Sequence, residues 1–529
     1  MLRNKCIWVV LCLVLLAGCR QSGTDRNSLT YSDLMEGFPY HSPLDEAALT
    51  IPEGAAAPRH VFEGRLELID EDRTGEIKFL RGGPAGGAHL PEFDFEFVQQ
   101  DSYLIPVQRS LIITPHQDWN YFLEPGRVWY EPADGDYSRA SFPFALSWKG
   151  SNAIHNGTMT FLFNDGGISR VWYQVTQETA LELRFDMWGL LEAVYHPHPL
   201  ADAGQIRTDF IQERADRMPV KPIETLIEAY PAVDLSAFGD GVTPEAMTWY
   251  GFVVEGVNYL GGCHTRYGVY PYCEYMRAPS YSTAKSAFAS LALMRLAQKY
   301  DPGVAHLLVR DYVPEASGSI GDWSQVTFDH VLDMASGNFR TSARMVDEEQ
   351  WDSDPFWSQE YYQPRIKAAF NWPHTAPPGT TWVYRTSDTF IVTRAMQGYL
   401  GSLEGPHADI FDFVVEEIYI PLKMGPGVYA TLRTRDDDWQ GQPYGGYGLW
   451  WVPDDLAKIT TLLNVDHGRI GGQQILHPGL LDKALQRDPL DRGVPRDGGG
   501  FFIIMHVGRM HTSWGRVQGV QFGCPRCMD

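Results

Sequence analysis

Residues 281–296 read YSTAKSAFASLALMRL and combine a candidate nucleophile with the start of an apolar helix. Ser282 and Lys285 are three positions apart, which puts both side chains on one face of a helix. A serine hydroxyl is a poor nucleophile until a base takes its proton, and a lysine one turn away either takes it or lowers the pKa of a second base. The helix N-terminus adds positive potential where an oxyanion develops. Of all the lysines in the chain, only Lys285 follows a serine by three positions.

Four further segments follow this helix in order. They read WSQVTFDHVLDMASGNF (323–339), PPGTTWVYRTSDTF (377–390), YGGYGLWWVPDDLAKITTLL (444–463) and GRIGGQQILHPGLL (468–481). Together with the serine–lysine segment, this order resembles the serine β-lactamase-like superfamily, in particular class C β-lactamases, D,D-peptidases and related esterases. The resemblance covers residues 242–500, about half of the chain. It implies an antiparallel sheet flanked by helices, a helical subdomain, and a site between them.

The resemblance also assigns roles to three residues. Ser282 matches the acylated serine, Lys285 its partner, and Tyr384 the tyrosine of the family's Y-x-N segment. A phenol beside a lysine can act as a general base, because a nearby cation favours the phenolate form. The alternative for Tyr384 is an ordinary packed aromatic side chain.

One departure from the family concerns the Asn of Y-x-N, which is Thr386 here. A hydroxyl can hydrogen-bond to the lysine or to substrate, but it lacks the combined donor and acceptor reach of an amide. Ser387 or Asp388 is a candidate to compensate in substrate binding. The change puts recognition of a β-lactam or a peptide amide in doubt more than the hydrolysis of a simple ester.

A second departure concerns the third family motif, K-T-G or H-x-G on the strand that lines the site. No such strand is recognised; it is expected near or beyond the C-terminus. A shifted reading frame of residues 501–529 can encode Y-Y-N-A…V-W-V-P-x-M-H-G, which resembles the family's approach to that motif. We therefore expect a frameshift near residues 498–502; the alternative is a divergent native tail. On this interpretation the terminal C-x-x-C, Cys524 and Cys527, is neither a metal site nor a redox pair.

The N-terminus predicts export. A basic start is followed by an apolar run over residues 7–16, too short to span a bilayer as a mature helix and typical of a signal peptide. It ends in Leu-Ala-Gly before Cys19, which resembles a bacterial lipobox, with Arg20 next. We expect Cys19 to be lipidated and the protein to be anchored in the cell envelope, at the outer membrane facing the periplasm. The alternative is an ordinary signal peptide in which Cys19 is incidental.

Net charge limits the possible binding partners, and the pattern of apolar and polar residues predicts the fold class. A net charge of −23 argues against binding nucleic acid, which relies on Lys and Arg. Segments between residues 60 and 192 alternate apolar and polar residues, which predicts short antiparallel strands. We expect an α+β protein. Its expected parts are a signal peptide (1–18), a lipidated Cys and tether (19–58), an all-β domain (59–195), a connector (196–241), the β-lactamase-like domain (242–500) and the tail (501–529).

Local patterns add finer expectations. Residues 247–260 read as a strand pair, and helices are expected around residues 328–334, 390–399, 410–418 and 454–463. Cys263 and Cys273 can close a small disulfide loop in an oxidising periplasm; the alternative is two free thiols. His196 and His198 form an H-x-H pair, but the prolines beside them indicate an exposed loop rather than a metal site. No cofactor or metal is expected.

Two functions compete. The first is a serine hydrolase acting on a cell-wall peptide, a β-lactam or a small ester through an acyl-enzyme on Ser282. The second is a catalytically impaired cell-envelope protein that binds peptidoglycan with the same cleft. A β-rich adhesion module with a passive hydrolase-like body is a third possibility. The sequence leaves the substrate, the oligomeric state and the role of the β-rich region open.

Overall fold

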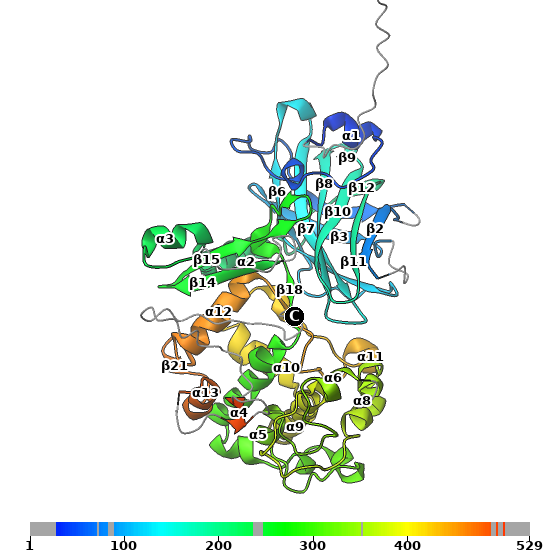
Figure 1. The fold of residues 1–529 in the computed structure, drawn as a ribbon. Helices are drawn as coiled ribbons and strands as arrows, with labels where there is room; N and C mark the ends of the chain where they lie inside the picture. The colour runs from blue at the N-terminus through cyan, green and yellow to red at the C-terminus, as the bar shows by residue number, and fades with distance from the viewer. Residues whose placement is uncertain are drawn as a thin grey trace, which may run out of the picture.

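The computed structural model describes residues 28–70, 73–82, 89–235, 247–350, 353–487, 493–495 and 501–502. Figure 1 shows a large antiparallel sheet at the top and a mostly helical body below it. The α+β class predicted from the sequence is confirmed. The expected tail (residues 501–529) lies almost entirely outside the described residues, as do Cys19 and the signal peptide.

The large sheet, β1–β12, runs in the order β12-β1-β3-β4-β6-β7-β8-β10-β11-β2, with β5 on β7 and β9 on β8. Aromatic and branched side chains such as Phe97, Phe142, Phe161 and Tyr173 fill its inner face and are fully buried. Its strands are β1 (Glu63–Leu68), β2 (Glu76–Arg81), β3 (Asp94–Gln100), β4 (Tyr103–Pro106), β5 (Trp119–Leu123), β6 (Gly126–Trp129), β7 (Ser138–Trp148), β8 (Ile154–Asn164), β9 (Gly167–Ile168), β10 (Val171–Thr179), β11 (Arg184–Leu191) and β12 (Ala193–Pro197).

Part of the expected tether is folded. Helix α1 (Tyr31–Glu36) and the 3-10 turn η1 (Glu46–Leu49) pack on the sheet. Leu34 and Leu49 are fully buried against Trp172 and Trp188, and these apolar contacts are what a free tether lacks. The expectation of a free tether over residues 19–58 is therefore wrong for residues 28–58, which are folded onto the sheet. Residues 19–27 lie outside the described residues.

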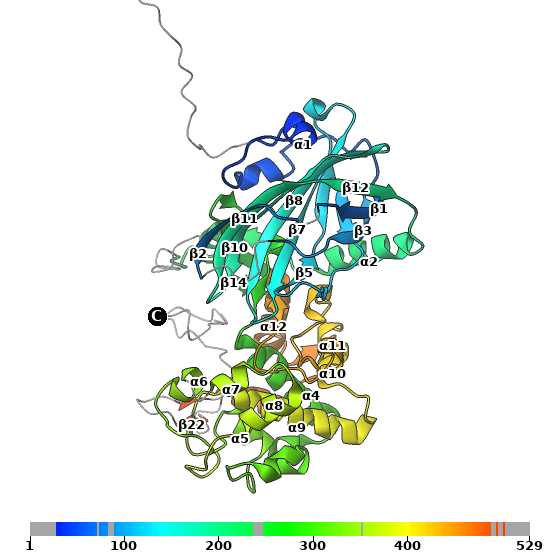
Figure 2. The same cartoon turned by 90° about the vertical axis from the view of Figure 1, so that its right-hand side faces the viewer.

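The connector lies between the sheet and the helical body (Figures 1 and 2). Helix α2 (Ala203–Asp216) places Phe210 on Tyr103 of β4, with ring centres 5.2 Å apart. After it come β13 (Val220–Pro222), η3 (Ile223–Thr225) and α3 (Leu226–Ala229). The expected strand pair is β14 (Trp249–Val254) and β15 (Val257–Gly262), and β13 joins it in the order β13-β15-β14.

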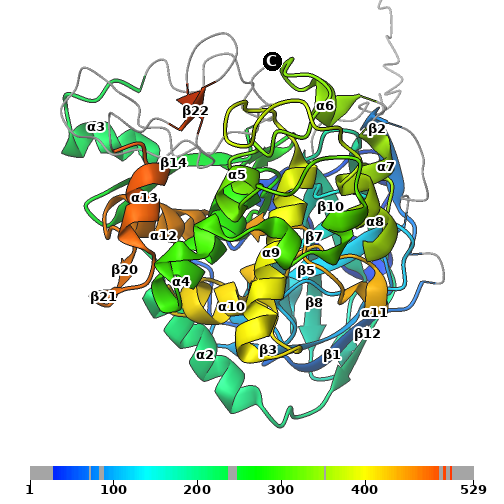
Figure 3. The ribbon, with the colours of Figure 1, turned by 90° about the horizontal axis from the view of Figure 1, so that it is seen from below.

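The helical body is built around the apolar helix that the sequence predicts. A π-helical turn, η6 (Lys285–Ser290), leads into α4 (Leu291–Lys299), and Figure 3 shows α4, α5 and α9 next to one another. The four expected helices correspond to α5, α9, α10 with η10, and α12. The helices are α5 (Phe328–Leu332), α6 (Val346–Glu349), α7 (Asp354–Trp357), α8 (Tyr362–Ala369), α9 (Thr386–Glu404), α10 (Ile410–Val414), η10 (Val415–Tyr419), α11 (Asp436–Trp439), α12 (Pro453–Asn464) and α13 (Pro478–Ala484).

Short strands complete this part of the chain. They are β16 (His264–Thr265) with β17 (Gly268–Val269), β18 (Ala278–Pro279) with β19 (Trp450–Trp451), β20 (Arg469–Ile470) with β21 (Gln473–Gln474), and β22 (Val494–Pro495) with β23 (Phe501–Phe502).

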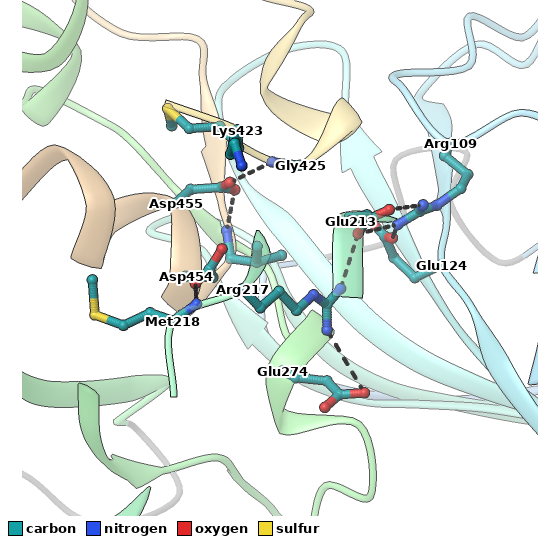
Figure 4. A network of polar contacts seen from close by, with 12 residues as sticks. Arg109, Glu124, Glu213, Arg217, Met218, Glu274, Lys423, Gly425, Asp454 and Asp455 are labelled. Carbon is teal, nitrogen blue, oxygen red and sulfur yellow. Dashed lines mark hydrogen bonds and ion pairs between the residues drawn. The ribbon is translucent and has the colours of Figure 1, made fainter. Parts of the chain in front are cut away.

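An apolar core and a polar network both contribute to joining the sheet and the helical body. Phe122, Ala145 and Ile154 of the sheet belong to the same apolar cluster as α4 and α9. Figure 4 shows the polar network beside it, in which Arg109 bridges Glu124 of the sheet and Glu213 of α2. Burial opposes ionisation of Glu213, but Arg109 and Arg217 outweigh it and lower the pKa of this carboxyl to about 2. Asp216 of α2 then pairs with Lys423 of the helical body, so charged pairs link the sheet to the body through α2.

Candidate functional site

Ser282 lies at a sharp bend between a strand ladder and a helix. Strand β18 pairs with β19, and the ladder continues through hydrogen bonds between Ser280 and Leu449. Tyr281 then adopts a left-handed backbone conformation with φ of 38°. Such a conformation is costly for a residue other than glycine and persists where surrounding contacts enforce it, often at functional sites. The bend places Ser282 three residues before the π-helical turn, another feature common at functional sites.

Two of the predicted residues, Lys285 and Tyr384, both contact the hydroxyl oxygen of the third, Ser282. Lys285 Nζ donates a hydrogen bond to Ser282 Oγ at 3.1 Å, and the Tyr384 hydroxyl donates to the same oxygen. Lys285 Nζ also lies 5.0 Å from the centre of the Tyr384 ring. Lys285 is 2% and Tyr384 7% exposed. Two hydrogen-bonding groups are thus held against the hydroxyl of Ser282 in a largely dry setting, where such interactions are strong.

Thr386 stands at the first position of α9 and links Lys285 to an acidic residue. Its hydroxyl accepts a hydrogen bond from Lys285 Nζ at 2.8 Å and donates one to Glu348 Oε1 at 2.6 Å. Its backbone N–H donates to Glu348 Oε2 at 2.8 Å. The hydroxyl is therefore engaged on both sides, so Thr386 organises Lys285. Glu348 was missed in the sequence because no motif marks it.

Lys285 has a third acceptor in the backbone. Its Nζ donates to the carbonyl oxygen of Gly446 at 3.2 Å. A Cβ atom at Gly446 would lie 2.6 Å from Thr386 Cγ2, so a glycine is what lets this carbonyl come so close. The YGGYGLWW segment thus supplies a backbone acceptor for Lys285, a role that could not be predicted from its sequence.

A cavity of about 340 Å³ opens beside Ser282. Its wall comes from both parts of the protein. The large sheet supplies Gly150, Ser151, Asn152, Leu181 and Glu182, and the helical body supplies Tyr281, Ser282, Met345, Glu348, Glu349, Ser353, Asp354, Trp357, Tyr384, Thr386 and Tyr447. Four of these side chains are carboxylates, and none of the described lining residues is Lys or Arg. The cavity lining is therefore acidic and also rich in aromatic side chains.

The other two candidates for substrate binding do not reach this cavity. Asp388 is fully buried and forms an ion pair with Arg385 at 2.6 Å. Burial raises the pKa of Asp388, while Arg385 opposes the shift. Ser387 is 4% exposed, and neither residue is part of the cavity wall. Residues 386–388 begin a helix, so only the first of them faces Lys285.

The remaining sequence candidates lie elsewhere. Cys263 and Cys273 are joined by a disulfide with Cα atoms 5.4 Å apart. His196 and His198 bond to Glu67 and Glu96 at the edge of the large sheet. Within the described ranges no group of three or more His, Cys, Asp or Glu side chains could hold a metal ion. Cys524 and Cys527 lie outside the described residues.

None of the helices in the described part of the chain is long and apolar enough to cross a membrane.

Comparisons with known proteins give likeness in structure only. No model of a known protein family matches the chain, and no curated protein matches it. Among solved structures, it is similar to EstCE1, described as a hydrolase with promiscuous acyltransferase activity (13% identity, TM-score 0.35, 50% of this chain and 77% of that one). It is also similar to a D-stereospecific amidohydrolase from Streptomyces sp. (16%, 0.28, 40% and 67%). A third is a β-lactamase/D-alanine carboxypeptidase from Yersinia pestis (16%, 0.24, 35% and 53%). At TM-scores this low the likeness says nothing about the activity of this chain.

Proposed function

We propose that this chain is a serine hydrolase of the β-lactamase-like superfamily that cleaves an ester or amide through an acyl-enzyme on Ser282. One observation carries the proposal. Ser282 Oγ receives hydrogen bonds from both Lys285 Nζ and the Tyr384 hydroxyl, at the wall of a cavity large enough for a small acyl group. Nucleophile and base within hydrogen-bond reach, with the base oriented by a third group, is the arrangement that covalent catalysis needs.

The proposed reaction has two balanced steps. Once deprotonated, the Tyr384 oxygen that donates in the resting site becomes an acceptor, and this phenolate, stabilised by Lys285, takes the proton from Ser282 Oγ, which bonds to the carbonyl carbon of the substrate. The phenol then returns this proton to the leaving alcohol or amine as its bond to carbon breaks. A water molecule attacks the acyl-enzyme, giving up one proton to Tyr384. Departure of the acid restores the Ser282 hydroxyl with that proton.

The acidic wall of the cavity favours substrates that are neutral or positively charged near the scissile bond. Glu182 and Asp354 are exposed at this wall, where a charge attracts or repels a substrate over about 10 Å at 0.1 M salt and about 30 Å at 0.01 M. We expect kcat/KM to be higher for a cationic aminoacyl ester than for an anionic succinyl ester. Added salt and the Glu182→Gln variant should both reduce the difference in kcat/KM between the two esters. Equal values at low salt would remove this part of the proposal.

Hydrolysis assays test the activity itself. Wild type and the Ser282→Ala variant are compared on p-nitrophenyl esters and on a chromogenic cephalosporin. We expect turnover by wild type that is lost in the variant. Absence of turnover on both substrate classes, with retained binding of peptidoglycan fragments, would instead support the catalytically impaired binding protein.

We further propose that Cys19 carries a lipid that holds the mature protein in the cell envelope. Small residues directly before this cysteine are what such processing needs. The Cys19→Ala variant should move from the membrane to the soluble fraction. Continued dependence on detergent would contradict the anchor.

A further inference from the structure

The turn between β7 and β8 of the large sheet reaches the nucleophile through Asn152. This side chain is 1% exposed. Its Oδ1 accepts hydrogen bonds from the backbone N–H groups of Tyr281 at 2.9 Å and Gly448 at 3.0 Å, and from Ser280 Oγ at 3.0 Å. Its Nδ2 donates to the carbonyl of Leu449 at 3.0 Å. Both ends of the amide are thus used to join two backbone segments.

These two segments carry the atoms that the proposed reaction uses. Tyr281 is the left-handed residue directly before Ser282, and its N–H is the group that Asn152 binds. Gly448 follows two positions after Gly446, whose carbonyl binds Lys285. A strained backbone is maintained only when its surroundings enforce it. Asn152 therefore holds the backbone next to the nucleophile Ser282 through Tyr281. Through Gly448 it also holds the backbone near the carbonyl that binds Lys285.

We propose that Asn152 is a positioning residue of the active site, and that the large sheet is an integral part of this site. The inference rests on the proposed serine hydrolase function. The sheet also contributes Gly150, Ser151, Leu181 and Glu182 to the cavity wall, so two of its turns line the cavity. An amide suits this place because it offers an acceptor and a donor together. Aspartate keeps the acceptor but sets a carboxylate against the Leu449 carbonyl, and alanine offers neither.

Asn156 provides a matched control on the same hairpin. It is also 1% exposed, and it also bonds to the backbone of the helical body, at Arg277 N and O, both at 2.9 Å. Its partner Arg277 lies five positions before Ser282, and none of the described hydrogen bonds joins Asn156 to residues 280–282 or 446–449. If the asparagines only dock the sheet on the body, replacing either one should have the same effect.

The experiment measures kcat and KM on p-nitrophenyl acetate and the rate at which a fluorophosphonate labels Ser282. Wild type, Ser282→Ala, Asn152→Ala, Asn152→Asp and Asn156→Ala are compared, with urea unfolding of each. We expect Asn152→Ala to lower kcat and the labelling rate on the order of 100-fold with KM little changed, as misplaced reacting groups do. Asn152→Asp should fall between it and wild type. Asn156→Ala should lose stability but keep kcat.

Wild-type rates in Asn152→Ala, or equal losses of kcat in both alanine variants, would overturn the positioning role. Should Asn152→Ala fail to fold, a folded Asn152→Asp with wild-type kcat would overturn it equally. Failure of the proposed function looks different, because wild type itself would then label no faster than Ser282→Ala.

Discussion

Lys285 Nζ is surrounded by three oxygen atoms, those of Ser282, Thr386 and the Gly446 carbonyl. Three acceptors match the three N–H donors of an ammonium group, whereas a neutral amine has two N–H bonds and a lone pair. The geometry therefore favours a charged Lys285 that stabilises a phenolate on Tyr384 over a lysine that takes the serine proton itself. Glu348, one hydrogen bond further away, supplies a negative charge that supports this cation.

Replacing Thr386 by valine should separate Lys285 from Glu348. The variant removes the acceptor for Lys285 and leaves Glu348 Oε1 without the hydroxyl donor. Hydrogen bonds to charged groups contribute about 1.5–3 kcal/mol, so we expect kcat on p-nitrophenyl acetate to fall about 10- to 100-fold. Thr386→Ser keeps the hydroxyl and should stay close to wild type. A valine variant with the kcat of wild type would show that this link is not needed.

Sequence alone could predict Ser282 and Lys285, because their spacing is local, and Tyr384 through its motif. It could not predict Glu348 or Asn152. Their partners Thr386 and Tyr281 are 38 and 129 positions away, and a single acidic residue or amide carries no pattern. The sequence also indicated Ser387 and Asp388 as candidates for substrate binding beside Thr386. Only the geometry of the helix shows which of these three neighbours faces Lys285.

The disulfide loop after β15 connects the helical body to the large sheet. Tyr270 and Tyr272 lie inside this loop, and their hydroxyls donate to the carbonyls of Gly157 in β8 at 2.8 Å and Ser141 in β7 at 2.7 Å. Both tyrosines are buried, and burial raises the pKa of each. The disulfide closes the loop at its base. It thereby reduces the conformational entropy that the loop loses when these two tyrosines bind the sheet.

Removing this disulfide should destabilise the protein without touching the site. For a loop of this length we expect the Cys263→Ser, Cys273→Ser double variant to lose about 2–3 kcal/mol of unfolding free energy. Urea unfolding measures the loss, and reductant should lower the stability of wild type to that of the variant. Reductant that leaves wild type unchanged would contradict a structural role for the bond.

Local periodicity predicted several elements of the fold, including the strand pair at β14–β15 and the helices α5, α9 and α12. Their order within a sheet could not be predicted. Strand β2, for example, pairs with β11 across about a hundred residues, and nothing in either segment encodes that partner. The folded part of the expected tether was missed for the same reason, since its apolar residues acquire meaning only against Trp172 and Trp188. The frameshift remains a prediction.

At the scale of the whole molecule, two buried carboxyl groups in the described part of the chain respond to pH near neutrality. Burial raises the pKa of Glu46 and of Asp455 to about 7. Glu46 is fully buried against the sheet and accepts hydrogen bonds from Thr176 at 2.7 Å and Gln174 at 2.9 Å. A raised pKa means that the folded state holds the proton more tightly than the unfolded chain. Each group therefore stabilises the fold at low pH, and this contribution is lost as pH rises from about 4 to 7.

The Glu46→Gln variant should flatten this dependence. A rise in pKa from 4.5 to about 7 corresponds to about 3 kcal/mol. We expect the free energy of unfolding of wild type to fall between pH 4.5 and pH 8, and the variant to show a fall smaller by about that amount. Glu53→Gln, at an exposed position near the same segment, is the control. Parallel pH profiles for wild type and Glu46→Gln would mean that Glu46 is ionised in the folded protein throughout.

Formation of the acyl-enzyme is the step on which the whole account depends, and mass spectrometry detects it directly. The protein is mixed with a p-nitrophenyl ester or a β-lactam, quenched in acid within seconds, and analysed intact and after digestion. We predict one acyl group per molecule, on the peptide that contains Ser282, with a matching burst of released p-nitrophenol from the ester. The Ser282→Ala variant should show neither. An acyl group on another residue, or undiminished turnover by Ser282→Ala, would contradict the assignment of Ser282 as the nucleophile.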